Sequence, residues 1–139
     1  MSIISRAPSL TAIISLVFAL AGFSYNAWRL EQSEENNIVR DAAFQVLTEL
    51  AEFEQVIYAN YYDQNPVEGS PRLGWVKIGL VNDLAMLIGP EVTSSANELK
   101  SNWAGNWVTV HENRGVVDAL VADIDDVRDR VKKRLDQLE

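Results

Sequence analysis

Three tryptophans and a lysine are the residues whose types and spacing could bind a ligand. Trp103 and Trp107 are four positions apart, so a helix would place them on one face, and Trp75 could meet them from a preceding segment. Converging aromatic rings bind cations or flat ligands, although paired tryptophans also fill cores whose other positions are small. The candidate ligand-binding residues are therefore Trp75, Lys77, Trp103 and Trp107.

Lys77 stands out because a helical wheel places it among apolar side chains such as Leu73, Val81 and Leu84. A lysine in such a position either pairs with a carboxylate, faces a ligand, or lays its stem over apolar surface with the ammonium in water. We expect the last of these, a stem over apolar surface with the ammonium in water near the start of the helix, with an ion pair or a ligand-facing charge as the alternatives.

Metal and acid–base chemistry have weaker support. His111 is the only histidine, and the aspartates between Asp118 and Asp129 lack the glycine-centred loop of a calcium site. Asp126 and Arg130 have instead the i,i+4 spacing of a solvated helix face. We expect His111 to be a surface residue near a helix end, and we predict no metal site and no cofactor.

A second acidic group surrounds Glu52 and Glu54, with tyrosines and Asp63 nearby. Carboxylates that share acid–base work must face each other, whereas residues two apart on a helix point in different directions. We predict no catalytic residue here, and we expect the tyrosines to close one end of a helical bundle. The chain is therefore not expected to be an enzyme.

The segment from Ala7 to Trp28 contains no charged residue, and Leu10 to Phe23 is its apolar centre. At about 1.5 Å per residue, the uncharged segment spans roughly 33 Å as a helix, close to the thickness of a bilayer's hydrocarbon core. Aromatic and basic residues flank it, as is typical where a helix crosses the membrane interface. The predicted membrane-interface residues are Arg6, Tyr25, Trp28 and Arg29.

A cleaved signal peptide is the alternative interpretation, because Ala19-Leu20-Ala21 matches a small-x-small cleavage pattern. Apolar residues continue past that point to Trp28, which favours an uncleaved single-pass anchor. Arg6 and the terminal amine favour a cytoplasmic N-terminus, with the C-terminal domain periplasmic or extracellular. Arg29 competes with this orientation.

Apolar residues spaced by three and four continue through the rest of the chain, which predicts helices throughout. Between Gly22 and Pro66 the stripe is Val39, Ala43, Val46, Leu50, Phe53 and Ile57, widened by Phe44, Leu47 and Tyr61. Ser70 and Pro71 have the types of an N-cap and a first helical residue. The segment from Arg72 to Ile88 is apolar on most of its circumference, which is typical of a helix central to a bundle or covered by a partner.

Gly89-Pro90 ends that helix, and a kink and a hairpin are equally compatible with so short a connection. We expect Asn113-Arg114-Gly115 to form a turn before a last helix with the apolar residues Val117, Leu120, Ile124, Val127, Val131, Leu135 and Leu138. The fold class predicted is all-α. An N-terminal transmembrane helix in residues 1–30 precedes an antiparallel helical bundle of three to four helices in residues 31–139.

The charge of the 139-residue chain restricts its partners. Its net charge of −8 disfavours nucleic acid, because neutralisation of phosphates supplies most of that affinity. Its densest basic cluster, in residues 128–134, would meet anionic lipid if the helices alternate in direction. No cysteine is present, so disulfides and thiolate chemistry are excluded.

We expect the chain to be an interaction or accessory module, with the lipid bilayer and a protein partner or a second copy as its partners. A small-ligand sensory domain without its own signalling output is the alternative. A pocket lined by the tryptophans would favour the sensory domain, and a packed core with an exposed apolar stripe would favour the interaction module.

Overall fold

The computed structural model describes residues 9–138, and in these residues the fold is all-α, as predicted. The helices are α1 (Leu10–Tyr61), α2 (Pro71–Ile88), α3 (Pro90–Asn106) and α4 (Arg114–Asp136). The chain separates into two units, Met1–Asn36 and Asn37–Glu139. Each unit is described by itself.

The described part of the first unit consists almost entirely of helix, the N-terminal part of α1. Its apolar side chains are exposed along the whole segment from Leu10 to Phe23. Helix α1, to which this segment belongs, is long and apolar enough in its N-terminal part to cross a membrane, by length and composition.

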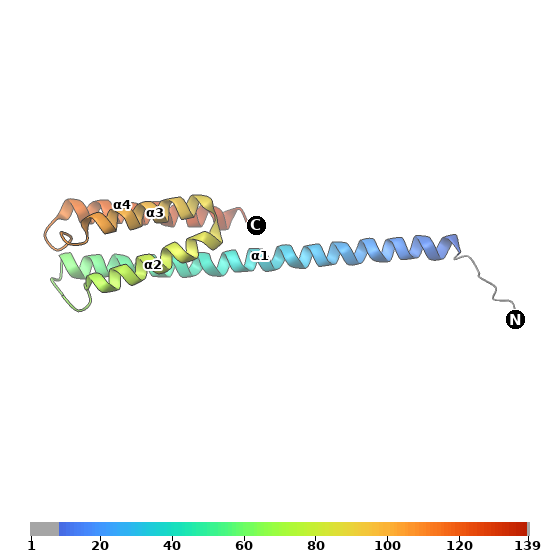
Figure 1. The fold of residues 1–139 in the computed structure, drawn as a ribbon, viewed down its shortest axis with the longest axis horizontal. Coiled ribbons are helices and arrows are strands. Elements are labelled where there is room, and N and C mark those ends of the chain that lie inside the picture. Colours follow the sequence, from blue (N-terminus) through green and yellow to red (C-terminus); the bar gives the residue numbers. More distant parts are fainter. Residues whose placement is uncertain (1–8, 139) are drawn as a thin grey trace. The chain divides into compact units, whose positions relative to one another are not determined.

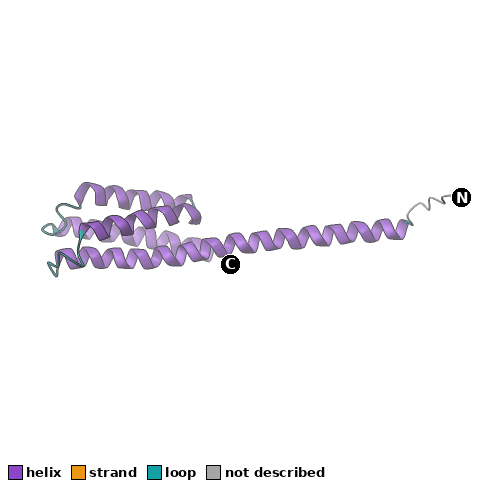
Figure 2. Ribbon diagram, turned by 60° about the horizontal axis from the view of Figure 1, so that its bottom comes forward, coloured by secondary structure: helices purple, strands orange, loops and turns teal. Residues whose placement is uncertain are grey.

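The second unit is an antiparallel bundle of the C-terminal part of α1 with α2, α3 and α4, and the helices alternate in direction (Figures 1 and 2). Two hydrogen bonds show the reversal between α2 and α3. Asn82 Nδ2 donates to Ala96 O over 3.1 Å, and Thr93 Oγ1 donates to Ala85 O over 3.1 Å. Of these two pairs, the one that lies further along α3 lies nearer the start of α2. The two helices therefore run antiparallel, and Gly89-Pro90 is a hairpin and not a kink.

Glycine is required at that hairpin. Gly89 has φ 156° and ψ 166°, a conformation that side chains bearing a Cβ rarely adopt. Pro90 follows at the first helical position, where its missing N–H removes no hydrogen bond. The two residues together end α2 and begin α3 with no intervening loop.

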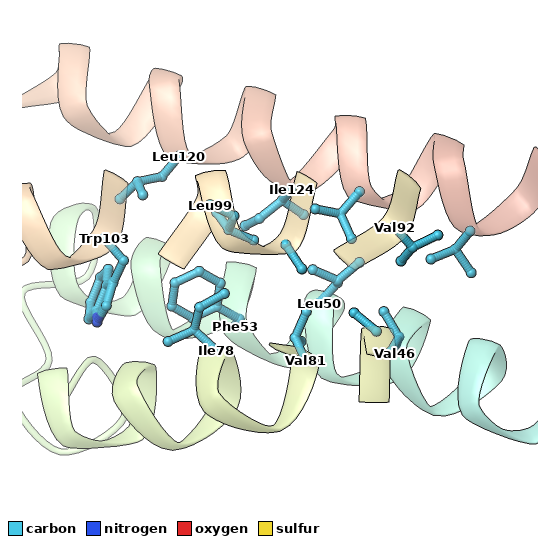
Figure 3. Close-up of a cluster of buried hydrophobic side chains, with 14 of the residues drawn as sticks. Val46, Leu50, Phe53, Ile78, Val81, Val92, Leu99, Trp103, Leu120 and Ile124 are labelled. Atoms are coloured by element: carbon cyan, nitrogen blue, oxygen red, sulfur yellow. The ribbon is translucent and has the colours of Figure 1, made fainter. Parts of the chain in front are cut away.

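The core of the bundle is an apolar layer to which all four helices contribute (Figure 3). The predicted stripe of α1 faces this layer: Ala43, Val46, Leu50, Phe53 and Ile57 are buried, and Val39, Leu47 and Tyr61 pack against them. The prediction that Phe44 belongs to this core-facing stripe is wrong, because its side chain is 59% exposed. The α1 face that meets the core is therefore narrower than the sequence pattern indicates.

The predicted boundaries are confirmed at α2, where Ser70 is the N-cap residue and Pro71 the first helical residue. The predicted turn at Asn113-Arg114-Gly115 is wrong in part. Asn113 is the N-cap of α4, and its side chain accepts a hydrogen bond from Val116 N over 3.3 Å. Arg114 and Gly115 therefore lie in the first turn of α4.

Candidate functional site

The tryptophan cluster lies in the packed core of the bundle. Trp103, on α3, is 1% exposed, and its ring meets Phe53 of α1 edge to face with centroids 5.1 Å apart (Figure 3). Trp75 of α2 approaches the same indole with centroids 6.3 Å apart. Trp103 Nε1 has no hydrogen-bond partner among the described residues.

Gly74 explains how the Trp103 indole fits against α2. A Cβ atom added to Gly74 would come within 2.8 Å of Trp103 Cη2, closer than real Cβ atoms approach other atoms. The ring therefore lies directly against the backbone of α2. Of the predicted ligand-binding residues, the structure brings Trp75 and Trp103 into contact, while Trp107 is the C-cap of α3 and is 37% exposed.

Lys77, the fourth predicted ligand-binding residue, forms ion pairs with α1. Its Nζ lies 3.0 Å from Glu49 Oε2 and donates a hydrogen bond to Glu52 Oε2. The hydrogen bond to Glu52, followed by the Glu49 carboxylate, raises the pKa of Lys77 above its ordinary value. The expectation that the ammonium extends into water is therefore wrong: Lys77 forms the ion pair that was the alternative, because Glu49 and Glu52 of α1 lie within its reach, and the pair ties α2 to α1.

Glu54 points toward a different helix from Glu52. It accepts hydrogen bonds from Arg128 of α4 and from the hydroxyl of Tyr58, each over 2.9 Å. The hydrogen bond to Glu54 raises the pKa of the Tyr58 hydroxyl. The two carboxylates do not face each other, in agreement with the sequence prediction.

The remaining charged residues singled out in the sequence lie at the surface. Asp126 and Arg130 form the predicted i,i+4 pair, with Oδ2 and Nε 2.8 Å apart. His111 is exposed beside Glu112, and no group of three metal-ligating residues is present in residues 9–138. Arg134 Nε donates to Ile88 O over 3.2 Å, so part of the basic cluster serves contacts within the bundle.

The predicted membrane-interface residues lie at the C-terminal end of the apolar stretch, except Arg6, which lies outside the described residues. The rings of Tyr25 and Trp28 have centroids 6.1 Å apart, and both side chains are exposed. Arg29 follows directly. An aromatic pair next to a cation is the side-chain set found at the headgroup level of membrane helices.

The second candidate site is an apolar stripe of α2 that the bundle covers only in part. Val76, Leu87 and Leu73 are 65%, 53% and 41% exposed, and Leu80 and Leu84 between them are half-buried. Their spacing of three and four places all five on one stripe of the helix. We call this stripe the α2 outer face: Leu73, Val76, Leu80, Leu84 and Leu87.

The opposite side of α2 is the core-facing side, which contains Ile78, Val81, Ala85 and Ile88. The apolar surface of α2 thus extends beyond its core-facing side, and the bundle covers the α2 outer face only in part, at Leu80 and Leu84. Arg72, Lys77 and Asp83 are the only charged residues of α2. Protein–protein contacts often use exposed apolar side chains grouped on one helix surface, such as Val76, Leu87 and Leu73 here.

Sequence reasoning missed Asn82, which is 8% exposed on the core side of α2. Its amide donates to Ile78 O over 2.9 Å and to Ala96 O, so it joins α2 to α3. A single asparagine in a strongly apolar helix was the available signal, because a buried amide needs a partner.

Comparison of the chain with protein-family models, with curated protein sequences and with solved structures finds no match.

Proposed function

We propose that the chain is a membrane-anchored interaction module whose helical bundle docks a protein partner through the α2 outer face. The α2 outer face is the observation that carries the proposal, because it combines exposed leucine and valine side chains with few charges. Covering a fully exposed leucine or valine contributes about 1.5–3 kcal/mol, and the exposed 41–65% of Leu73, Leu87 and Val76 would each contribute a part of that.

The apolar stretch of α1 supports the anchor. Its exposed apolar side chains and its aromatic and basic flank suit retention in a bilayer. Under the positive-inside rule, the N-terminal basic residue favours a cytoplasmic N-terminus and a bundle in the periplasm or outside the cell. A secreted bundle released by signal peptidase is the alternative for this segment.

The packing of the tryptophans favours docking over ligand sensing. Trp103 is held between Phe53, Trp75 and the α2 backbone, so its ring fills core volume. A ligand that entered there would have to displace these contacts. We therefore propose a binding role in which the outer surface of the bundle, and not its interior, meets the partner.

Comparative affinity purification in mild detergent tests the proposal. The full chain is compared with the double variant Val76→Glu/Leu87→Glu, which changes two well-exposed positions and so spares the core. Ala104→Glu, at an exposed position of α3, is the matched control. Circular dichroism verifies that the three proteins are equally helical.

We expect the same proteins to co-elute with the wild-type chain and with Ala104→Glu, and to be lost with Val76→Glu/Leu87→Glu. Recovery of an unchanged set of proteins with the double variant would overturn the α2 outer face as the docking surface.

A further inference from the structure

A groove of about 530 Å³ lies between α1, the loop that follows it and the first half of α2. Leu73 belongs both to this groove and to the α2 outer face, so the two surfaces are continuous. A partner that covers Leu73 therefore also borders the groove. The other residues that line the groove are Glu52, Gln55, Val56, Tyr58, Ala59, Asp63, Glu68 and Lys77.

The charge of this groove is acidic. Glu52, Asp63 and Glu68 line it, and Lys77 is the only cation among its lining residues. The ammonium of Lys77 is already paired with Glu49 and Glu52. Asp63 and Glu68 are exposed and have no ion-pair partner within residues 9–138. Their carboxylates are therefore free to pair with the cations of a partner.

The α2 outer face supplies an apolar strip beside these carboxylates. It extends over the 14 positions from Leu73 to Leu87, which is roughly 21 Å of helix at about 1.5 Å per residue. The other edge of the strip carries Arg72 and Asp83, whose charges cancel. An apolar strip with acidic groups along one edge suits an amphipathic helix, which lays its apolar face on the strip and keeps its charged face outside.

We propose that the partner segment on the α2 outer face is a cationic amphipathic helix, whose basic side chains pair with Glu52, Asp63 and Glu68. The proposal rests on the docking role argued above and names the chemistry of the partner. Charge complementarity selects this occupant, because a chain with a net charge of −8 attracts a cationic segment and repels an anionic one. A helix of about 15 residues covers the length of the strip.

A pair of model peptides tests the preference for positive charge. The probe is a fluorescent peptide of about 18 residues, with leucines spaced by three and four and lysine at the other positions. Its counterpart has glutamate in place of every lysine. Each peptide is titrated into the full chain in nanodiscs of zwitterionic lipid, and empty nanodiscs measure binding to the lipid alone.

We expect the lysine peptide to bind the chain about tenfold more tightly than the glutamate peptide, and this ratio should fall as salt screens the charges. Equal binding of the two peptides, after subtraction of the binding to empty nanodiscs, would overturn the proposal.

Two charge variants test whether the carboxylates of the groove are responsible. Asp63→Lys/Glu68→Lys changes the groove, and Glu98→Lys/Asp129→Lys makes the same change of net charge at exposed positions of α3 and α4. We expect the groove variant to bind the lysine peptide about fivefold more weakly, and the control within about twofold of wild type. Equal weakening by both would contradict the groove, because only net charge would then matter.

Lys77 provides a readout that a loss of folding cannot imitate. Lys77→Met removes the only cation from the lining of the groove and leaves Glu49 and Glu52 free for the partner. The lysine peptide should therefore bind this variant several-fold more tightly, at a temperature at which circular dichroism shows the bundle folded. Unchanged or weaker binding would contradict the proposal.

Photocrosslinking tests where the peptide lies. The full chain carries p-benzoylphenylalanine in place of Val76 on the α2 outer face, or in place of Ala122 on the exposed side of α4 as the control. We expect the Val76 position to crosslink the lysine peptide at several times the yield of the Ala122 position. Equal yields would mean that the peptide does not select the α2 outer face.

The two proposals fail in different ways. Loss of co-eluting proteins with Val76→Glu/Leu87→Glu, together with equal binding of the two peptides, would retain the docking surface and reject a cationic partner. An unchanged set of co-eluting proteins with that double variant would reject the docking surface itself.

Discussion

The indole of Trp103 lies directly on the backbone of Gly74, with no room for a side chain between them. A Cβ atom at position 74 would overlap ring atoms that are themselves packed against Phe53 and Trp75. The contact fixes how closely α2 and α3 approach in this part of the bundle.

Gly74→Ala is therefore expected to destabilise the bundle although alanine favours helix. Overpacking a core costs about 1–3 kcal/mol, against roughly 1 kcal/mol gained from helix propensity. We expect a net loss of up to about 2 kcal/mol in thermal or urea unfolding followed by circular dichroism. Gly79→Ala is the matched control on α2, because a Cβ there meets no atom within 4 Å, and it should stabilise. Equal stabilisation by both substitutions would contradict the packing of Trp103 on Gly74.

The ion pairs of Lys77 predict a dependence of stability on alkaline pH. The pKa of Lys77 is raised in the folded state, so its contribution to stability is present below its ordinary value of 10.5 and is lost as the pH rises through the raised pKa. The raised pKa of Tyr58 acts in the same direction, because the folded state favours the protonated hydroxyl.

Lys77→Met should lower the free energy of unfolding at pH 7 by about 1–2 kcal/mol, since it leaves the mostly buried Glu49 without its cation. Denaturant unfolding from pH 7 to pH 11 measures the effect. The difference between wild type and variant should shrink above pH 10.5. A difference that stays constant to pH 11 would mean that the charge of Lys77 contributes nothing to stability.

The sequence predicted much of this fold because its signals are local. Apolar spacing located the helices, and Pro71 and Gly89-Pro90 located two of their ends. The direction of the chain after Gly89 could not be predicted, because it depends on contacts such as Asn82 with Ala96 between residues far apart in sequence. The exposure of Phe44 was missed for a similar reason, since the position of neighbouring helices decides which edge of the α1 stripe is covered.

The candidate sites were likewise predictable only where the sequence signal lies within a single helix. The exposed stripe of α2 has a sequence signal, a helix that is apolar on more than one side. The partners of Lys77 had no sequence signal, because Glu49 and Glu52 belong to another helix and so acidic a chain offers many other carboxylates. The packing of Trp103 on Gly74 could not be predicted from the sequence either, because it depends on the register of α2 against α3.

The proposed anchor predicts a strong effect of one charge in the apolar segment. Val17→Arg places a cation near its centre, at a cost of about 3 kcal/mol for membrane insertion. The variant should move from the membrane to the soluble fraction when membranes are extracted with alkaline carbonate. Ser33→Arg, beyond the apolar segment, should remain in the membrane. A wild-type chain that is itself fully extracted would contradict the anchor.

Site-specific thiol labelling in intact cells tests the central claim of a membrane-anchored bundle most directly. The full chain carries one cysteine, either Ser2→Cys before the apolar segment or Ala119→Cys on the exposed side of α4. A membrane-impermeant maleimide should label Ala119→Cys in intact cells, after removal of any outer envelope, and Ser2→Cys only after the membrane is permeabilised. Labelling of both positions under the same condition, or an intact mass that lacks residue 2 through residue 21, would contradict an uncleaved helix that spans the membrane.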